Sequence, residues 1–104
     1  MTGGSLVAEE KIKIGNNVMV GANTVIMDTD FHPLSSKTRR KSPMAGRTTS
    51  VIIEDNVFIG TQVIILKGTR IGKNSVIGAG SVVLGNIPKN VIAAGNPAKV
   101  IRKL

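Results

Sequence analysis

Hydrophobic residues recur at every sixth position along most of the chain. The phased positions are Ile14, Val20 and Ile26, followed by Ile53, Ile59, Ile65, Ile71, Ile77 and Val83. All nine are Ile or Val, although these two residue types fill only 25 of the 104 positions. A period of six does not fit an α-helix, whose period is 3.6, or a meander of longer strands. The pattern therefore predicts short strands joined by corners, with the phased side chain pointing inward.

The residues between the phased positions support this interpretation. Gly directly follows the phased residue at 15, 21, 60, 72 and 78, and Asn occurs at 16, 17, 23, 56 and 74. Both residue types tolerate the positive φ that a tight corner requires. We therefore expect these residues to shape corners rather than to take part in chemistry. The fifth position of the hexads is mostly small or β-branched: Val18, Thr24, Val57, Val63, Thr69, Ser75 and Ser81.

The phase divides the single domain, residues 1–104, into segments. Stacked coils are expected over 2–31 and 51–88, where each coil contacts only its neighbours. Between them 27 residues separate Ile26 from Ile53, which is not a multiple of six. Residues 32–50 are therefore predicted to form a loop extruded from the stack, and 89–104 a short C-terminal tail. A long loop on a rigid scaffold is a frequent place for function.

The amino-acid composition excludes several kinds of site. The chain has no Cys, which excludes disulfides, thiolate metal sites and a cysteine nucleophile. One His is too few for a metal site of several imidazoles, so no metal is expected. No apolar run approaches the ~20 residues of a membrane span, and we expect a soluble, cytoplasmic protein. Aromatic residues make up only 2%, which suits a narrow core filled by Ile and Val.

The charge balance points to an anionic partner. Lys and Arg total 14 against 6 Asp and Glu, a formal net charge of +8. Such an excess suits nucleic acid, a phosphorylated ligand or a membrane surface. Residues that could stack on bases are nearly absent, which disfavours single-stranded nucleic acid. A phosphate-bearing cofactor therefore fits better. Within the predicted loop, five basic residues occur without an acidic one: Lys37, Arg39, Arg40, Lys41 and Arg47.

Three features together resemble a known family. They are the hexads, the stretch 28–33 (Asp-Thr-Asp-Phe-His-Pro) and the stretch 94–101 (Ala-Gly-Asn-Pro-Ala-Lys-Val-Ile). The combination is similar to the hexapeptide-repeat acetyltransferases, in the galactoside/maltose O-acetyltransferase branch. The resemblance implies an all-β, left-handed parallel β-helix of triangular section, assembled as a homotrimer. The left hand comes from the resemblance alone, because crossovers between parallel strands are normally right-handed.

The resemblance also implies an activity. Acetyl-CoA would be the acyl donor, and a hydroxyl of a sugar or polysaccharide the acceptor. His32 matches the family's general base, a role that suits an imidazole near neutral pH. Asp30 lies two residues earlier and could orient the imidazole, or could simply satisfy a corner of the prism. Without a Cys, direct attack of the acceptor hydroxyl on the thioester is the economical mechanism.

Coenzyme A residues follow from the same resemblance. Phe58 and Thr61 match positions that line the pantetheine channel, and Ala79 matches a backbone contact to the same arm. Lys99 and Arg102 match basic positions near the nucleotide phosphates.

Two departures from the family pattern keep an alternative open. Residues 84–86 are Leu-Gly-Asn where many relatives have Thr-Lys-Asp, and the chain starts almost directly on the hexads. An N-terminal segment that contributes to the acceptor site is therefore expected to be absent. These departures favour a non-catalytic trimeric scaffold that binds coenzyme A unproductively.

Overall fold

The computed structural model describes residues 5–7, 12–27 and 50–104, the first of these in backbone only. The strands are β1 (Ser5–Val7), β2 (Ile12–Ile14), β3 (Met19–Val20), β4 (Val25–Met27), β5 (Val51–Ile53), β6 (Phe58–Ile59), β7 (Ile64–Ile65), β8 (Arg70–Ile71), β9 (Val76–Ile77), β10 (Val82–Val83), β11 (Asn86–Ile87), β12 (Val91–Gly95) and β13 (Ala98–Lys103). The described part of the chain contains no helix.

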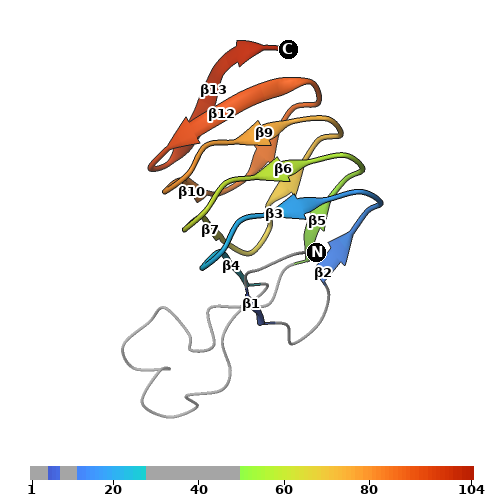
Figure 1. Ribbon diagram of the computed structural model, residues 1–104, viewed down its shortest axis with the longest axis vertical. Coiled ribbons are helices and arrows are strands. Elements are labelled where there is room, and N and C mark those ends of the chain that lie inside the picture. The colour runs from blue at the N-terminus through green and yellow to red at the C-terminus, as the bar shows by residue number, and fades with distance from the viewer. Residues whose placement is uncertain (1–4, 8–11, 28–49) are drawn as a thin grey trace.

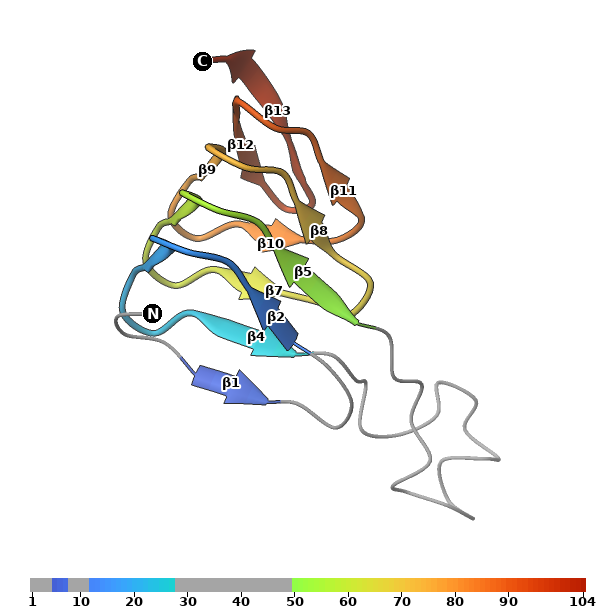
Figure 2. The ribbon, with the colours of Figure 1, turned by 90° about the vertical axis from the view of Figure 1, so that its right-hand side faces the viewer.

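Successive strands go in turn to three sheets. Sheet A has the order β1-β4-β7-β10, sheet B the order β11-β8-β5-β2, and sheet C the order β13-β12-β9-β6-β3. All pairings are parallel except that of β12 with β13. Figure 1 shows the strands of sheet C stacked one above another, and Figure 2 shows those of sheet B. The fold is the expected left-handed parallel β-helix of triangular section.

The prism has three edges, named here by the sheets they join. The B–C edge comprises residues 15–18, 54–57, 72–75 and 88–90, and the C–A edge comprises 21–24, 60–63 and 78–81. The described part of the A–B edge comprises 66–69 and 84–85. Each edge repeats from coil to coil because the strands on either side stay in register.

The phased Ile and Val side chains fill the axis of the prism. From Ile26 to Val83 each of them is at most 1% exposed. Val20 is also buried, and Ile14, in the lowest described coil, is half-buried against the same core. A side chain in each coil packs on those of the coils above and below it, which gives a continuous apolar column.

Buried hydroxyl groups at the fifth hexad position have hydrogen-bond partners. The Thr24 hydroxyl donates to the carbonyl of Gly60 at 2.9 Å and accepts from the Val63 amide at 3.3 Å. The Ser75 hydroxyl donates to the carbonyl of Pro88 at 2.6 Å. Buried polar groups are tolerated when they are paired in this way. These hydroxyls therefore tie successive coils together at the edges.

The glycines that follow the phased residues correct one sequence expectation. None of the five at 15, 21, 60, 72 and 78 has positive φ. Instead the next coil approaches so closely that a Cβ at Gly21 would lie 2.5 Å from the Thr61 amide nitrogen. Only Gly leaves room for this approach. Among the described residues, the glycines with positive φ are 68, 80, 85 and 95.

Asparagines with positive φ form a ladder along the B–C edge. Asn17, Asn56, Asn74 and Asn90 have φ values between 58° and 65°. The Asn56 side-chain amide donates to the Asn74 side chain at 3.3 Å, and Asn74 donates to Asn90 at 2.8 Å. Asn is one of the few residues with a Cβ that adopts this backbone conformation readily. The positive φ of Asn17, Asn56 and Asn74 confirms the expectation that they shape corners, and Asn90 extends the ladder beyond the asparagines that the hexads indicated.

Substituting Asn74 tests what the ladder contributes. We expect Asn74→Ala to lower the free energy of unfolding by about 1–2 kcal/mol, because it loses both side-chain bonds and places Cβ in the left-handed region. Asn74→Gly loses the same bonds without the backbone cost, so its loss should be clearly smaller. Urea denaturation of the two variants checks this; equal losses would show that the backbone conformation contributes nothing.

The C-terminal segment extends the prism. Strand β12 pairs in parallel with β9, and its Val91 and Ala93 are buried in the core. Strand β13 then returns antiparallel to β12. The segment predicted as a short tail is thus a β-hairpin that adds two strands to sheet C.

The predicted extruded loop falls on the A–B edge. The chain leaves sheet A after Met27 and enters sheet B at Val51. The register is the same on both sides, since Ile26 pairs with Ile65 and Ile53 pairs with Ile71. The coils on the two sides of residues 28–49 therefore continue one stack. Residues 28–49, with both predicted catalytic residues, lie outside the described residues.

Candidate active site

Three predicted cofactor residues lie in order along one edge of the prism. Thr61 and Ala79 occupy equivalent positions on the C–A edge of successive coils, above Ala22. The Thr61 hydroxyl donates to the Ala22 carbonyl at 2.6 Å, and the Gly80 amide donates to the Thr61 carbonyl at 2.9 Å. Lys99 continues the line, because its partner in the hairpin is Ala94, whose Cβ lies over Gly78.

Thr61 has a structural task in addition to its predicted one. Its hydroxyl hydrogen is used in the bond to Ala22, which joins two coils. The side chain is nevertheless exposed, and the oxygen lone pairs can still accept a hydrogen bond. We therefore expect Thr61 to position the edge and, at most, to accept a bond from a bound ligand.

Phe58 lies on the outer face of sheet C, beside this edge. It is 48% exposed and pairs across the sheet with Met19 below and Val76 above. A shallow hollow of about 330 Å³ lies against these strands. Its lining consists of Met19, Val20, Gly21, Phe58, Ile59, Gly60 and Thr61. An apolar hollow of this kind suits the uncharged arm of a thioester cofactor.

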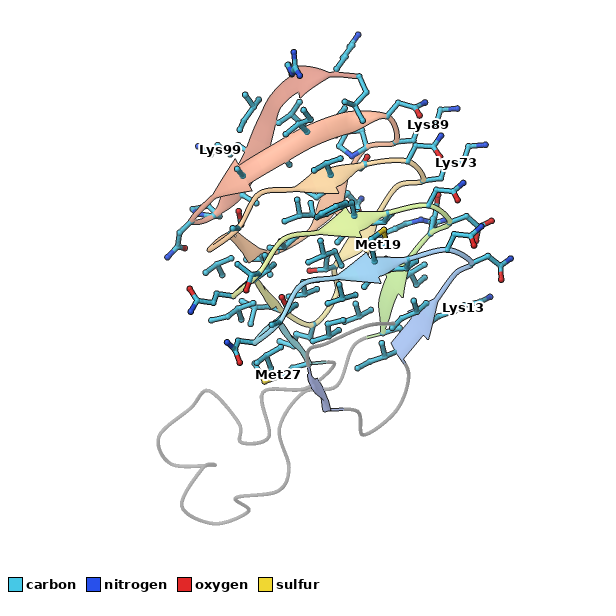
Figure 3. All side chains as sticks on the ribbon, in the orientation of Figure 1. Lys13, Met19, Met27, Lys73, Lys89 and Lys99 are labelled. Carbon is cyan, nitrogen blue, oxygen red and sulfur yellow. The ribbon has the colours of Figure 1, made fainter. Side chains whose placement is uncertain are left out.

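Met19 is a residue of this hollow that the sequence did not single out. It is 60% exposed and faces outward as the cross-strand partner of Phe58. The available signal was its hexad position, since Met19, Phe58 and Val76 each directly precede a phased residue. Figure 3 labels Met19 on sheet C and Lys99 at the tip of the C-terminal hairpin.

Arg102 lies on the last strand of the same sheet. Its partner in the antiparallel pair is Ile92, which in turn pairs with Val76. Residues paired in this way share a face of the sheet. The structure therefore brings all five predicted cofactor residues to sheet C or its C–A edge: Phe58, Thr61, Ala79, Lys99 and Arg102. Their contact with a cofactor remains a prediction.

The predicted catalytic residues follow another edge in the sequence. Asp30 and His32 follow Met27, where the chain leaves sheet A at the A–B edge, and both lie outside the described residues. The departure at residues 84–86 lies beside the same edge, where Leu84 is 58% exposed and Gly85 has φ of 88°.

Sheet B differs from the other two in its outer face. Arg70 forms an ion pair with Glu54 at 2.7 Å, and the Lys73 amide donates to the same carboxylate at 3.2 Å. The hydrogen bond from the Arg70 side chain, followed by that from the Lys73 backbone, lowers the pKa of Glu54. A hollow of about 450 Å³ on this face includes Lys13 and Asp55 in its lining. None of the predicted site residues lines it.

The described residues lack two other features. They contain no group of three or more His, Cys, Asp or Glu residues that could hold a metal ion. A membrane-spanning helix is likewise not found among these residues.

Family models match two parts of the chain. Residues 50–85 match the bacterial transferase hexapeptide (six repeats), and residues 11–27 match the hexapeptide repeat of succinyl-transferase. Between them lies the predicted loop, where the hexad phase is interrupted.

The chain is also similar to whole proteins. It is 49% identical over 100 residues to a galactoside O-acetyltransferase of Lactococcus lactis, covering 96% of this chain and 47% of that protein. A solved structure of galactoside acetyltransferase in complex with coenzyme A superposes with a TM-score of 0.90 at 40% identity, covering 96% of this chain and 48% of the other.

A hexapeptide-repeat acetyltransferase of Vibrio cholerae, complexed with acetyl-coenzyme A, gives a TM-score of 0.86 at 33% identity. That match covers 95% of this chain and 54% of the other. The chain thus spans about half the length of the relatives it matches. Together with the hexads and the three-sheet prism, these similarities show that the chain belongs to the hexapeptide-repeat acetyltransferases, in the branch that includes the galactoside O-acetyltransferases.

Proposed function

We propose that this chain binds acetyl-CoA along the C–A edge and transfers the acetyl group to a hydroxyl of a sugar or polysaccharide. The observation that carries the proposal is the alignment of Thr61, Ala79 and Lys99 along one edge, beside the apolar hollow at Phe58. The small side chain of Ala79 lets a ligand approach the backbone. A basic side chain at the far end suits the phosphates of the cofactor.

The chemistry assigned to the chain's own residues is proton transfer. Acetyl-CoA supplies the acyl group as a thioester. His32 accepts the proton of the acceptor hydroxyl while the hydroxyl oxygen bonds to the thioester carbonyl carbon. The carbon–sulfur bond then breaks, and His32 returns the proton to the departing thiolate sulfur. Asp30 would hold the imidazole in the orientation that this exchange needs.

A homotrimer is part of the proposal. The outer faces of sheets A and C are apolar, with Ile64 40% exposed on sheet A and Met19 and Phe58 exposed on sheet C. Sheet B instead carries the Glu54–Arg70 ion pair. Two apolar faces favour contact with neighbouring copies, which would also add buried surface to a small domain. In addition, His32 follows the A–B edge whereas the cofactor residues lie on the C–A edge, so a neighbouring copy could complete the site.

The sugar acceptor is proposed from the relatives. Galactosides appear in the names of the similar enzymes, and a sugar hydroxyl needs only the proton transfer described above. We propose a cytoplasmic location because acetyl-CoA, the proposed acyl donor, is available in the cytoplasm.

A non-catalytic scaffold is the second candidate. The Leu-Gly-Asn sequence at 84–86 favours it, because a hydroxyl and an ammonium present in many relatives are missing beside the A–B edge. The retained His32 opposes it. The two candidates differ in turnover: a scaffold would bind coenzyme A without releasing the thiol from acetyl-CoA.

Enlarging Ala79 tests the cofactor edge. We expect Ala79→Leu to weaken coenzyme A binding by about tenfold or more, because the larger side chain obstructs the approach to the backbone. The matched control is Asn16→Leu, which enlarges the equivalent position on the B–C edge. Calorimetric titration with coenzyme A measures both. Unchanged binding by Ala79→Leu, or an equal loss in Asn16→Leu, would contradict the placement of the cofactor.

A further inference from the structure

The C-terminal end of the prism exposes apolar side chains that its core does not use. On and just after β13, Val100 is 47% exposed, Ile101 63% and Leu104 60%. These are three of the seven large hydrophobic side chains that are exposed in the described part of the chain. With Lys89 and the basic residues of the same strand they form what is called here the C-terminal end surface, consisting of Lys89 and residues 99–104.

Charge along the chain is segregated toward this end. Asp55 is the last acidic residue, so residues 56–104 contain no Asp or Glu at all. The same stretch contains seven basic residues: Lys67, Arg70, Lys73, Lys89, Lys99, Arg102 and Lys103. Four of these lie on the C-terminal end surface. Figure 3 shows Lys89 and Lys99 on opposite sides of the C-terminal hairpin.

The register of the hairpin leaves the exposed Ile101 without a cross-strand partner. Arg102 pairs with Ile92 and Val100 pairs with Ala93, so Ile101 is the extra residue of a β-bulge. A bulge re-aims a side chain and twists the strand. Bulges and lysines also protect an edge strand against pairing with another sheet. Edge protection would account for the bulge and the charges, but it would favour a polar residue at position 101.

The link between the hairpin and Lys89 makes the surface continuous. The Leu104 amide donates to the Asn90 carbonyl at 2.8 Å, which holds the end of β13 next to the B–C edge. Lys89 directly precedes Asn90, and Lys103 directly precedes Leu104. Two lysines that are not among the predicted cofactor residues therefore flank this backbone contact.

We propose that the C-terminal end surface docks on an anionic lipid surface. Exposed aliphatic side chains among Lys and Arg are the combination that inserts into the headgroup region of such a membrane. Lysine stems can cover apolar area while their ammonium groups reach the lipid phosphates. A nucleic acid would use the charges without the aliphatic side chains, and a protein partner would not require a surface devoid of acidic residues.

The proposal does not depend on the transferase activity. Its test avoids Lys99 and Arg102, which are placed in the cofactor site, and uses two double variants of the full chain. One is Lys89→Gln with Lys103→Gln, and the other is Ile101→Ser with Leu104→Ser. The matched control is Lys13→Gln with Lys73→Gln, which removes the same charge from positions outside the C-terminal end surface.

Co-sedimentation with vesicles of equal parts phosphatidylcholine and phosphatidylglycerol is the measurement. We expect the unmodified chain to bind these vesicles and not pure phosphatidylcholine. Each lysine near an anionic membrane stabilises binding. Replacing both Lys89 and Lys103 by Gln should therefore lower partitioning into the vesicles by about tenfold or more. The Ile101/Leu104 pair should weaken it as well, and the control much less.

Three results would overturn the proposal. Absence of binding to the anionic vesicles does so directly. An equal loss in the Lys13/Lys73 control would indicate a diffuse effect of net charge rather than a docking surface. Full binding by the Ile101/Leu104 variant would show a purely electrostatic contact, of the kind that any polyanion could make. Circular dichroism of each variant establishes that it retains the β-fold.

Discussion

Replacing His32 by alanine is expected to lower kcat for acetyl transfer by about 10²–10⁴, the usual range for loss of a general base. Without the imidazole, the acceptor hydroxyl must lose its proton to water as it attacks the thioester. Release of the coenzyme A thiol from acetyl-CoA, followed in the presence of galactosides and oligosaccharides, measures the rate. Coenzyme A binding should persist, because the predicted cofactor residues lie on sheet C and its C–A edge.

The control for this substitution is Lys13→Gln, an exposed residue on sheet B, beside a hollow that none of the predicted site residues lines. It should leave the rate within about twofold of the unmodified chain, because surface substitutions away from a site typically have small effects. If the unmodified chain and His32→Ala were equally inactive across acceptors while both bound coenzyme A, the catalytic role would be wrong. The scaffold alternative would then describe the chain.

Replacing Ile53 by alanine is expected to lower the free energy of unfolding by about 2–5 kcal/mol, through lost apolar burial and the cavity left in the column. Ile53 is 1% exposed and packs in the axis of the prism, between the coil of Ile14 and that of Ile71. Because single domains are stable by only about 5–15 kcal/mol, this loss is a large fraction of the total. Thermal or urea unfolding of the purified chain measures it.

Ile52 provides a matched comparison on the same strand. Substituting Ile52 by alanine removes the same atoms as the change at Ile53. However, Ile52 faces the outer side of sheet B, between Lys13 and Arg70. Ile52→Ala should therefore cost less than half as much as Ile53→Ala. Equal costs would contradict the inward phase of the hexads, on which the description of the core rests.

The six-residue period of the sequence predicted most of the fold. It placed Ile26, Ile53, Ile59 and the later phased residues in the core, and the small or β-branched residues at the fifth hexad position, such as Val57 and Val63, are buried beside them. It also located the corners, since Asn17, Asn23, Asn56 and Asn74 all have positive φ. Periodicity is informative here because every coil repeats the same local geometry.

The local role of the glycines could not be obtained in the same way. A Gly that permits positive φ and a Gly that permits close approach look identical in the sequence. Only the distance from Gly21 to the Thr61 backbone in the next coil distinguishes them. Likewise Gln62 occupies a corner with φ of 56°, although its residue type gives no hint of this conformation.

The C-terminal hairpin marks the limit of the repeat. After Ile87 the hexad pattern ends, and the antiparallel return of β13 depends on a turn at residues 96–97 rather than on a period. The left hand of the prism has no signal in hydrophobic patterning either. It followed from the family resemblance, and no local preference of these residues would have predicted it.

Only part of the candidate site could be predicted from the sequence. Spacing by coils predicts that Thr61 and Ala79 stack, because both follow the glycine of a hexad. It does not show that Lys99 reaches the same edge, which depends on the hairpin register with Ala94. Met19 was missed because its signal is a hexad position that it shares with Phe58 and Val76, and not a motif. The roles of Asp30 and His32 stay predictions.

The central claim is that acetyl-CoA lies along the C–A edge with its thioester within reach of a His32 imidazole. A crystal structure of the chain soaked with acetyl-CoA tests it most directly. The account predicts the pantetheine arm beside Phe58, Thr61 and Ala79, the phosphates near Lys99 and Arg102, and the thioester carbon near His32 of the same or a neighbouring copy. Coenzyme bound elsewhere, or no electron density for it at millimolar ligand, would contradict the account.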